Sequence, residues 1–111
     1  MRVEPESVGS VTLVRLNGDL VIGKPEATFK EEMSKLVKSG KINLIIDLDS
    51  VRYLDSTGLG SLVRTYTSTR KAGGTTKLLN VGPRNRKILE ITRLITIFEI
   101  FDDRAAALAS F

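Results

Sequence analysis

Two spacings of hydrophobic residues alternate along the chain, and they predict strands and helices in turn. Two short β-rich runs, Val3–Val8 and Val11–Leu16, are joined at Gly9-Ser10, a connection that suits a tight hairpin. Asn43–Leu48 holds consecutive apolar residues without alternation, which indicates a strand covered on both faces. Two later runs are also expected to be strands: Lys77–Val81 and Ile97–Phe101.

Between these runs the apolar residues take a helical spacing. A first helix is predicted from Pro25 to Ser39-Gly40, because an apolar stripe recurs at i, i+4, i+7 and i+8. A second helix, ending at Gly73-Gly74, is predicted from a stripe at i, i+3, i+4 and i+7. The two stripes consist of Phe29, Met33, Leu36 and Val37, and of Leu59, Leu62, Val63 and Tyr66.

Two shorter helices are expected in the last third of the chain. One opens at Pro83, and Ile88 and Ile91 are expected to face inward from it. The other runs through Leu108, with Asp102 as its cap, since a carboxylate there accepts unpaired backbone N–H groups.

The resulting order, β-β-α-β-α-β-α-β-α, predicts an α/β fold. Helices between strands require crossovers, so the sheet should be mixed and largely parallel, with an N-terminal β-hairpin and about four helices packed against it. The length of 111 residues fits one domain, and no linker or repeat divides the chain, so residues 1–111 are expected to form a single domain.

Composition narrows the function classes. Cysteine and histidine are absent, which removes the usual zinc sites and the usual neutral-pH general base, and no cofactor is predicted. The net charge is +4, but the basic residues are scattered along the sequence and do not alternate with stacking aromatics, so direct nucleic-acid binding is not expected. The tightest basic group, Arg84, Arg86 and Lys87, is interpreted as a solvated helix face. No apolar run approaches the length of a membrane span, so a cytoplasmic protein without a membrane partner is expected.

The segment from Asp47 to Gly60 carries the candidate chemistry. A buried strand ends in acidic residues, and the hydroxyls of Ser56 and Thr57 sit at the mouth of the next helix, where backbone N–H groups are unpaired. Gly58 and Gly60 should let another backbone approach the first turn. The simpler interpretation, that Asp55 or Ser56 only caps the helix, stays open on these residues alone.

The chain resembles the STAS family, the anti-sigma-factor antagonists and related domains of sulphate transporters, over nearly its whole length. The resemblance is sharpest at Tyr53-Leu54-Asp55-Ser56-Thr57-Gly58-Leu59-Gly60, which is similar to the family's aspartate-serine-serine/threonine-glycine-leucine-glycine signature. Further matching stretches are Val11 to Leu20, Asn43 to Leu48, Leu79 to Pro83 and Ile88 to Thr92, with Ile97-Phe98 beyond them.

The resemblance implies a partner-switching protein and not an enzyme. It implies that Ser56 is the phosphorylation site, with Thr57 as second choice. The partners implied are an anti-sigma factor that is a serine kinase of the GHKL type, and a metal-dependent protein phosphatase. The expected partner-binding residues are Asp19, Asp55, Ser56, Thr57, Gly58, Leu59 and Gly60, and a monomer is expected because partner exchange needs a free face.

Other functions stay open. Within the family, the chain could be a scaffold subunit of a stress-signalling assembly or of a lipid-transport complex. A response-regulator receiver takes phosphate on an aspartate at a strand end, a role that Asp47 or Asp49 could imitate, but its magnesium site needs an acidic pair after the first strand. Only Asp19 stands there, in Asn17-Gly18-Asp19. An enzyme is disfavoured because the sequence has no GxxxxGK or GxSxG motif and no histidine to activate Ser56.

Overall fold

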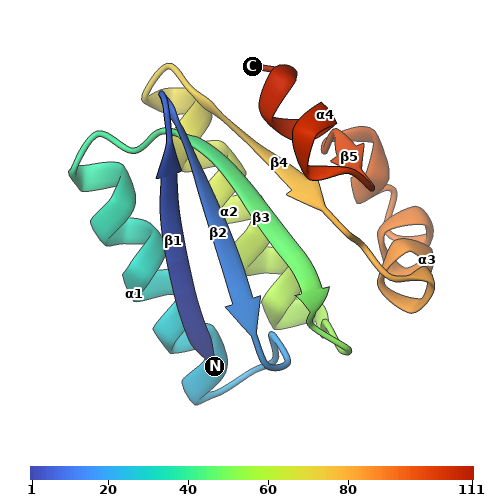
Figure 1. Cartoon of the computed structure of the whole chain (residues 1–111). Helices are drawn as coiled ribbons and strands as arrows, with labels where there is room; N and C mark the ends of the chain where they lie inside the picture. The colour runs from blue at the N-terminus through green and yellow to red at the C-terminus, as the bar shows by residue number, and fades with distance from the viewer.

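The computed structural model describes residues 1–111, and its five strands form one sheet in the order β1-β2-β3-β4-β5. β1 pairs antiparallel with β2 through the predicted hairpin, and every later neighbour pair is parallel. The mixed, largely parallel α/β sheet is therefore confirmed (Figure 1). The strands are β1 (Arg2–Val8), β2 (Val11–Asn17), β3 (Asn43–Ser50), β4 (Thr75–Leu79) and β5 (Ile100–Phe101).

Four α-helices connect or follow these strands. α1 and α2 lie side by side against one face of the sheet, whereas α4 lies on the other face, beside β4 and β5 (Figure 1). A 3₁₀ turn, η1 (Leu94–Thr96), leads from α3 to β5. The helices are α1 (Lys24–Lys38), α2 (Ser56–Lys71), α3 (Pro83–Ile91) and α4 (Arg104–Ala109).

The sheet separates a large apolar core from a small one. The large core joins the inward faces of α1, α2 and α3 to one face of the strands, and it includes the fully buried Phe29, Leu62 and Leu89. The small core, on the opposite face, is closed by Ala107 of α4. β3 contributes Leu44 and Ile46 to the large core and Ile45 to the small one. The prediction of a strand that is covered on both faces is therefore confirmed.

Three predictions for the C-terminal third are wrong in detail. Ile91 is 72% exposed, and α3 instead buries Asn85 and Leu89, one turn apart. β5 begins only at Ile100, because η1 and the following residues continue the turn that starts after α3. The cap of α4 is Asp103, whose side chain accepts from the backbone N–H of Ala106, and not Asp102.

Candidate functional site

The first turn of α2 lies at the carboxyl edge of the parallel strands and is capped by Asp55. The backbone of Asp55 is extended, and its Oδ1 accepts from the N–H of Gly58 at 2.8 Å. Its Oδ2 accepts from the N–H of Ile22 at 2.8 Å, so the same carboxylate also ties down the segment before α1. These backbone N–H donors, Ile22 first and Gly58 second, hold the pKa of Asp55 below its ordinary value. The cap interpretation of Asp55 is therefore confirmed.

Ser56 is the first residue of α2, and its side chain is exposed. Its hydroxyl makes no hydrogen bond within the chain, although many other Ser and Thr hydroxyls do, such as that of Ser61 with Glu26. Thr57 follows, half-buried and likewise without a side-chain partner in the chain. Ser56 is thus the hydroxyl of this pair that a second protein reaches more easily.

The two glycines of the first turn have different roles. A Cβ on Gly58 would lie 2.1 Å from the backbone oxygen of Leu20, so Gly58 is needed for the close approach that the sequence suggested. A Cβ on Gly60 would meet nothing within 4 Å, so for Gly60 that expectation is wrong. Leu59 is buried in the large core, and its side chain is not part of the exposed surface.

The side chain of Asp19 accepts hydrogen bonds from backbone N–H groups of the site. Its Oδ1 accepts from the N–H groups of Arg52 and Tyr53 at 3.2 and 3.3 Å. The N–H of Leu20 donates to the carbonyl of Tyr53 at 3.0 Å, so the loop after β2 and the loop after β3 form one unit. Asp19 and Asp55 together fix the position of Ser56 through backbone contacts.

The acidic residues at the end of β3 lie in different surroundings. Asp47 is 4% exposed, accepts from the N–H of Asp49 and the side-chain amide of Asn80, and faces Arg15 at 3.7 Å. Asp49 is exposed. No three Asp or Glu side chains gather into a group that could hold a metal ion. None of the helices has both the length and the hydrophobicity of a membrane-spanning helix.

Three features of the site escaped the sequence analysis. Asn85 is 1% exposed and donates from Nδ2 to the carbonyl of Val51 at 2.9 Å, which holds the loop after β3 against α3. Arg84 places its guanidinium 4.4 Å from the ring centre of Tyr53, so the expected solvated face is partly a stacking contact. Ile22 is 71% and Tyr53 41% exposed, and both flank the first turn of α2.

Comparison with known proteins finds one family over almost the whole chain. The family described as STAS domain matches residues 2–107. The "Anti-sigma F factor antagonist" of Paenibacillus polymyxa is 24% identical over 97% of this chain and 92% of that protein. The "Anti-sigma-B factor antagonist" of Bacillus subtilis is 39% identical over 71 residues, which are 64% of each chain.

A solved structure shows the same fold. The Bacillus cell fate determinant SpoIIAA, in its phosphorylated form, superimposes with a TM-score of 0.76 over 98% of each chain, at 21% identity. The N-terminal hairpin, the largely parallel sheet and its helices are therefore shared with a protein whose structure has been determined in a modified state.

Proposed function

The chain belongs to the STAS domain family, and from this premise we propose that it is an anti-sigma-factor antagonist that phosphorylation of Ser56 inactivates. In this proposal the unmodified protein binds an anti-sigma factor and so releases a sigma factor. The anti-sigma factor is a GHKL-type serine kinase that modifies Ser56, and a metal-dependent phosphatase restores the serine. The protein acts as a cytoplasmic monomer.

The observation that carries the proposal is an exposed, unpartnered hydroxyl on a rigid support. Ser56 opens α2, and the carboxylates of Asp55 and Asp19 fix the surrounding backbone through four hydrogen bonds from N–H groups. A kinase therefore meets the hydroxyl without having to unfold the first turn. The phosphorylated form of SpoIIAA supports the proposal, because it shows that this fold accommodates a phosphate.

A phosphate on Ser56 would be tolerated by the protein and resisted by a packed interface. It adds about −1.5 to −2 charges at neutral pH, and the unpaired N–H groups of a helix N-terminus stabilise such charge. At an interface the phosphate must lose water beside the carboxylate of Asp55. Unit charges about 4 Å apart interact by about 4 kcal/mol at an effective dielectric of ~20. Since about 1.4 kcal/mol is one decade of affinity, even part of this releases the partner.

The surface around Ser56 offers anchors for a protein partner. Ile22 and Tyr53 are the exposed large apolar side chains beside the first turn of α2. The guanidinium of Arg84 lies over the ring of Tyr53, and that of Arg52 lies 5.6 Å from the ring centre. Tyrosine and arginine are enriched among the few residues that dominate the binding energy of an interface.

Binding measurements with substituted proteins test the proposal. Ser56→Ala should bind a cognate anti-sigma factor within about threefold of the unsubstituted protein, whereas Ser56→Asp should bind about tenfold or more weakly. Ser10→Asp, in the exposed β1–β2 turn, is the matched control for an added carboxylate and should bind normally. If Ser56→Asp binds like Ser56→Ala, or loses binding only because it unfolds, the electrostatic account is wrong.

A further inference from the structure

The molecule carries its excess positive charge on one layer. Residues 24–41, which include α1, hold five lysines and three glutamates, and α2 holds Arg64, Arg70 and Lys71 with no acidic residue. The whole chain has a net charge of +4, so residues 24–41 and α2, which together carry +5, hold more than the entire excess. Residues that are scattered in the sequence thus gather on the face of the sheet that α1 and α2 cover.

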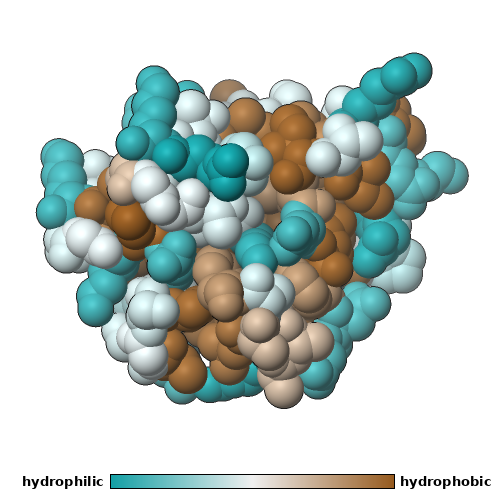
Figure 2. Space-filling view, turned by 90° about the horizontal axis from the view of Figure 1, so that it is seen from above, coloured by the Kyte–Doolittle hydropathy of each residue, from teal (hydrophilic) through white to brown (hydrophobic).

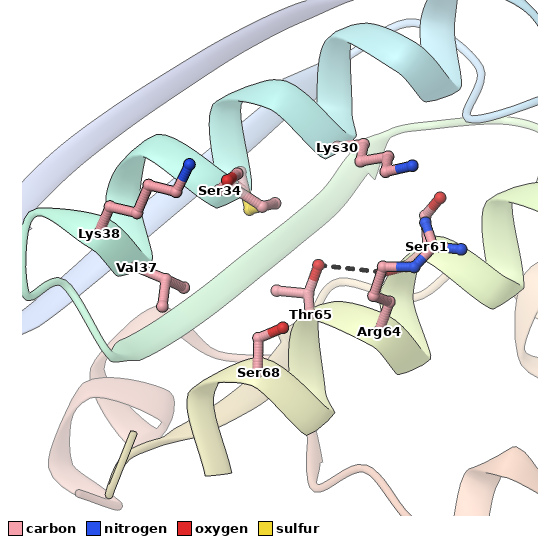
Figure 3. A pocket seen from close by; sticks show the side chains of 9 residues that line it. Lys30, Ser34, Val37, Lys38, Ser61, Arg64, Thr65 and Ser68 are labelled. Carbon is pink, nitrogen blue, oxygen red and sulfur yellow. Dashed lines mark hydrogen bonds between the residues drawn. The ribbon is translucent and has the colours of Figure 1, made fainter. Parts of the chain in front are cut away.

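A cavity of about 250 Å³ lies between these helices (Figure 3). Met33 and Val37 contribute apolar surface, and the rest of the lining is cationic or hydroxylic. Figure 3 shows Lys30 and Lys38 on α1 and Arg64 on α2 around the opening. The hydroxylic lining residues are Ser34, Ser61, Thr65 and Ser68.

The cations of this cavity are only partly neutralised. Arg64 lies 3.7 Å from the carboxylate of Glu26, which also accepts a hydrogen bond from Ser61. Lys30 and Lys38 form no ion pair, whereas Lys35 on the same helix pairs with two glutamates. The cavity therefore keeps two free ammonium groups and one shared guanidinium.

Some hydroxyl groups of the cavity are hydrogen-bonded within the chain and others are not. Thr65 donates to the carbonyl of Ser61 at 2.9 Å, so its proton is used within α2. The hydroxyls of Ser34 and Ser68 make no hydrogen bond within the chain and remain available as donors. The cavity thus combines free charge with free donors, as anion recognition requires.

We propose that this cavity binds a small organic anion with two or more phosphate or carboxylate groups. Lys30 and Lys38 are eight residues apart, which is about 12 Å along a helix, so a ligand with anionic groups at both ends matches them better than a single phosphate. Met33 and Val37 would contact its carbon skeleton. Pockets for such molecules begin at about 300 Å³, close to the volume found here. The site is separate from Ser56 and does not depend on the function proposed for it.

Titration of the isotope-labelled full chain with fructose 1,6-bisphosphate, and separately with citrate, tests the proposal by NMR. At least one probe should shift the backbone amides of Ser34, Val37, Thr65 and Ser68 in a saturable way, and the two arms distinguish phosphate from carboxylate. Lys30→Ala/Lys38→Ala should weaken binding about tenfold or more, since two charge-assisted contacts are lost. Both lysines are exposed and unpaired, so this variant should remain as stable as the parent.

The matched control removes the same charge elsewhere. Lys41→Ala/Lys71→Ala leaves the cavity lining intact and should bind each probe as the unsubstituted protein does. Equal weakening in both double variants would overturn the proposal, because it would show attraction to net charge only. The proposal would also be overturned if neither anion caused saturable shifts. The same holds if hexaglutamate bound these residues more tightly than fructose 1,6-bisphosphate and citrate do.

Discussion

Replacing Gly58 with alanine should destabilise the protein at its functional site. The added Cβ would lie 2.1 Å from the backbone oxygen of Leu20 and 3.0 Å from its carbonyl carbon. Leu20 cannot move aside easily, because its side chain is fully buried and its N–H is bonded to the carbonyl of Tyr53. The first turn of α2 and the loop after β2 must therefore separate.

The magnitude follows from two opposing terms. Overpacking against a rigid neighbour costs about 1–3 kcal/mol, and a backbone contact this short belongs at the upper end. The higher helix propensity of alanine returns about 1 kcal/mol. Gly58→Ala should therefore lower the free energy of unfolding by about 2 kcal/mol. Gly60 supplies the matched control, because Gly60→Ala meets nothing within 4 Å and should be stabilised by about 0.5–1 kcal/mol.

Urea denaturation of the three proteins, followed by circular dichroism, measures both changes. The midpoints of Gly58→Ala and Gly60→Ala should move in opposite directions from that of the parent, with little change in slope. Gly58→Ala should also bind an anti-sigma factor more weakly in the proposed function, since the segment around Ser56 is displaced. Two alanine variants of equal stability would refute the close approach of Leu20 and α2.

Other predictions concern the carboxylates. The pKa of Asp55 is lowered in the folded state, so the ionised carboxylate stabilises the fold at pH values above the ordinary pKa of aspartate. This contribution is lost as the pH falls through the lowered pKa. Asp55→Asn should abolish that part of the acid transition when stability is measured against pH. Asp19→Ala should lower the free energy of unfolding by about 1 kcal/mol through two lost hydrogen bonds, whereas Asp49→Ala, which loses none at its side chain, should change it by less than about 0.5 kcal/mol in the same urea assay. The exposed Glu6–Arg104 pair should matter little, and any drop in melting temperature on Glu6→Gln should disappear at high salt.

Most of the fold was predictable from the sequence because the spacing of apolar residues along each helix and strand shows which of its faces is buried. The unbroken run Asn43–Leu48 marks a strand between two cores, and the Phe29–Met33 spacing marks the buried stripe of α1. Prediction failed where a polar residue takes an apolar position. Asn85 is buried because its amide bonds the carbonyl of Val51, a contact between distant segments, and Ile91 is left exposed as a result.

Only part of the candidate site was predictable from the sequence: the helix-capping Asp55 was, whereas the buried Asn85 and most of the contacts were not. Asp55 could be expected to cap α2, whereas its second bond, to the N–H of Ile22, joins residues 33 positions apart. The role of Asp19 has the same character, since the N–H groups that donate to it, those of Arg52 and Tyr53, lie in the loop after β3. The cationic cavity between α1 and α2 could not be predicted from the sequence either, because its lining residues come from two separate segments.

The edge of the molecule opposite to the site carries the turn between β1 and β2. Figure 2 views the end where β1 turns into β2, and hydrophobic groups there lie among projecting hydrophilic side chains. The residues of the proposed switch lie at the opposite edge, beyond the carboxyl ends of β2 and β3, around Ser56. The location agrees with the rule that open α/β sheets place their sites beyond the carboxyl ends of their strands.

The most direct test of the central claim is intact-mass spectrometry of the protein after incubation with ATP and a cognate anti-sigma-factor kinase, with the modified residue mapped by fragmentation. We predict one added phosphate, located on Ser56 and absent from Ser56→Ala. A phosphate on Asp47 or Asp49, or none with a kinase that demonstrably binds the protein, would contradict it.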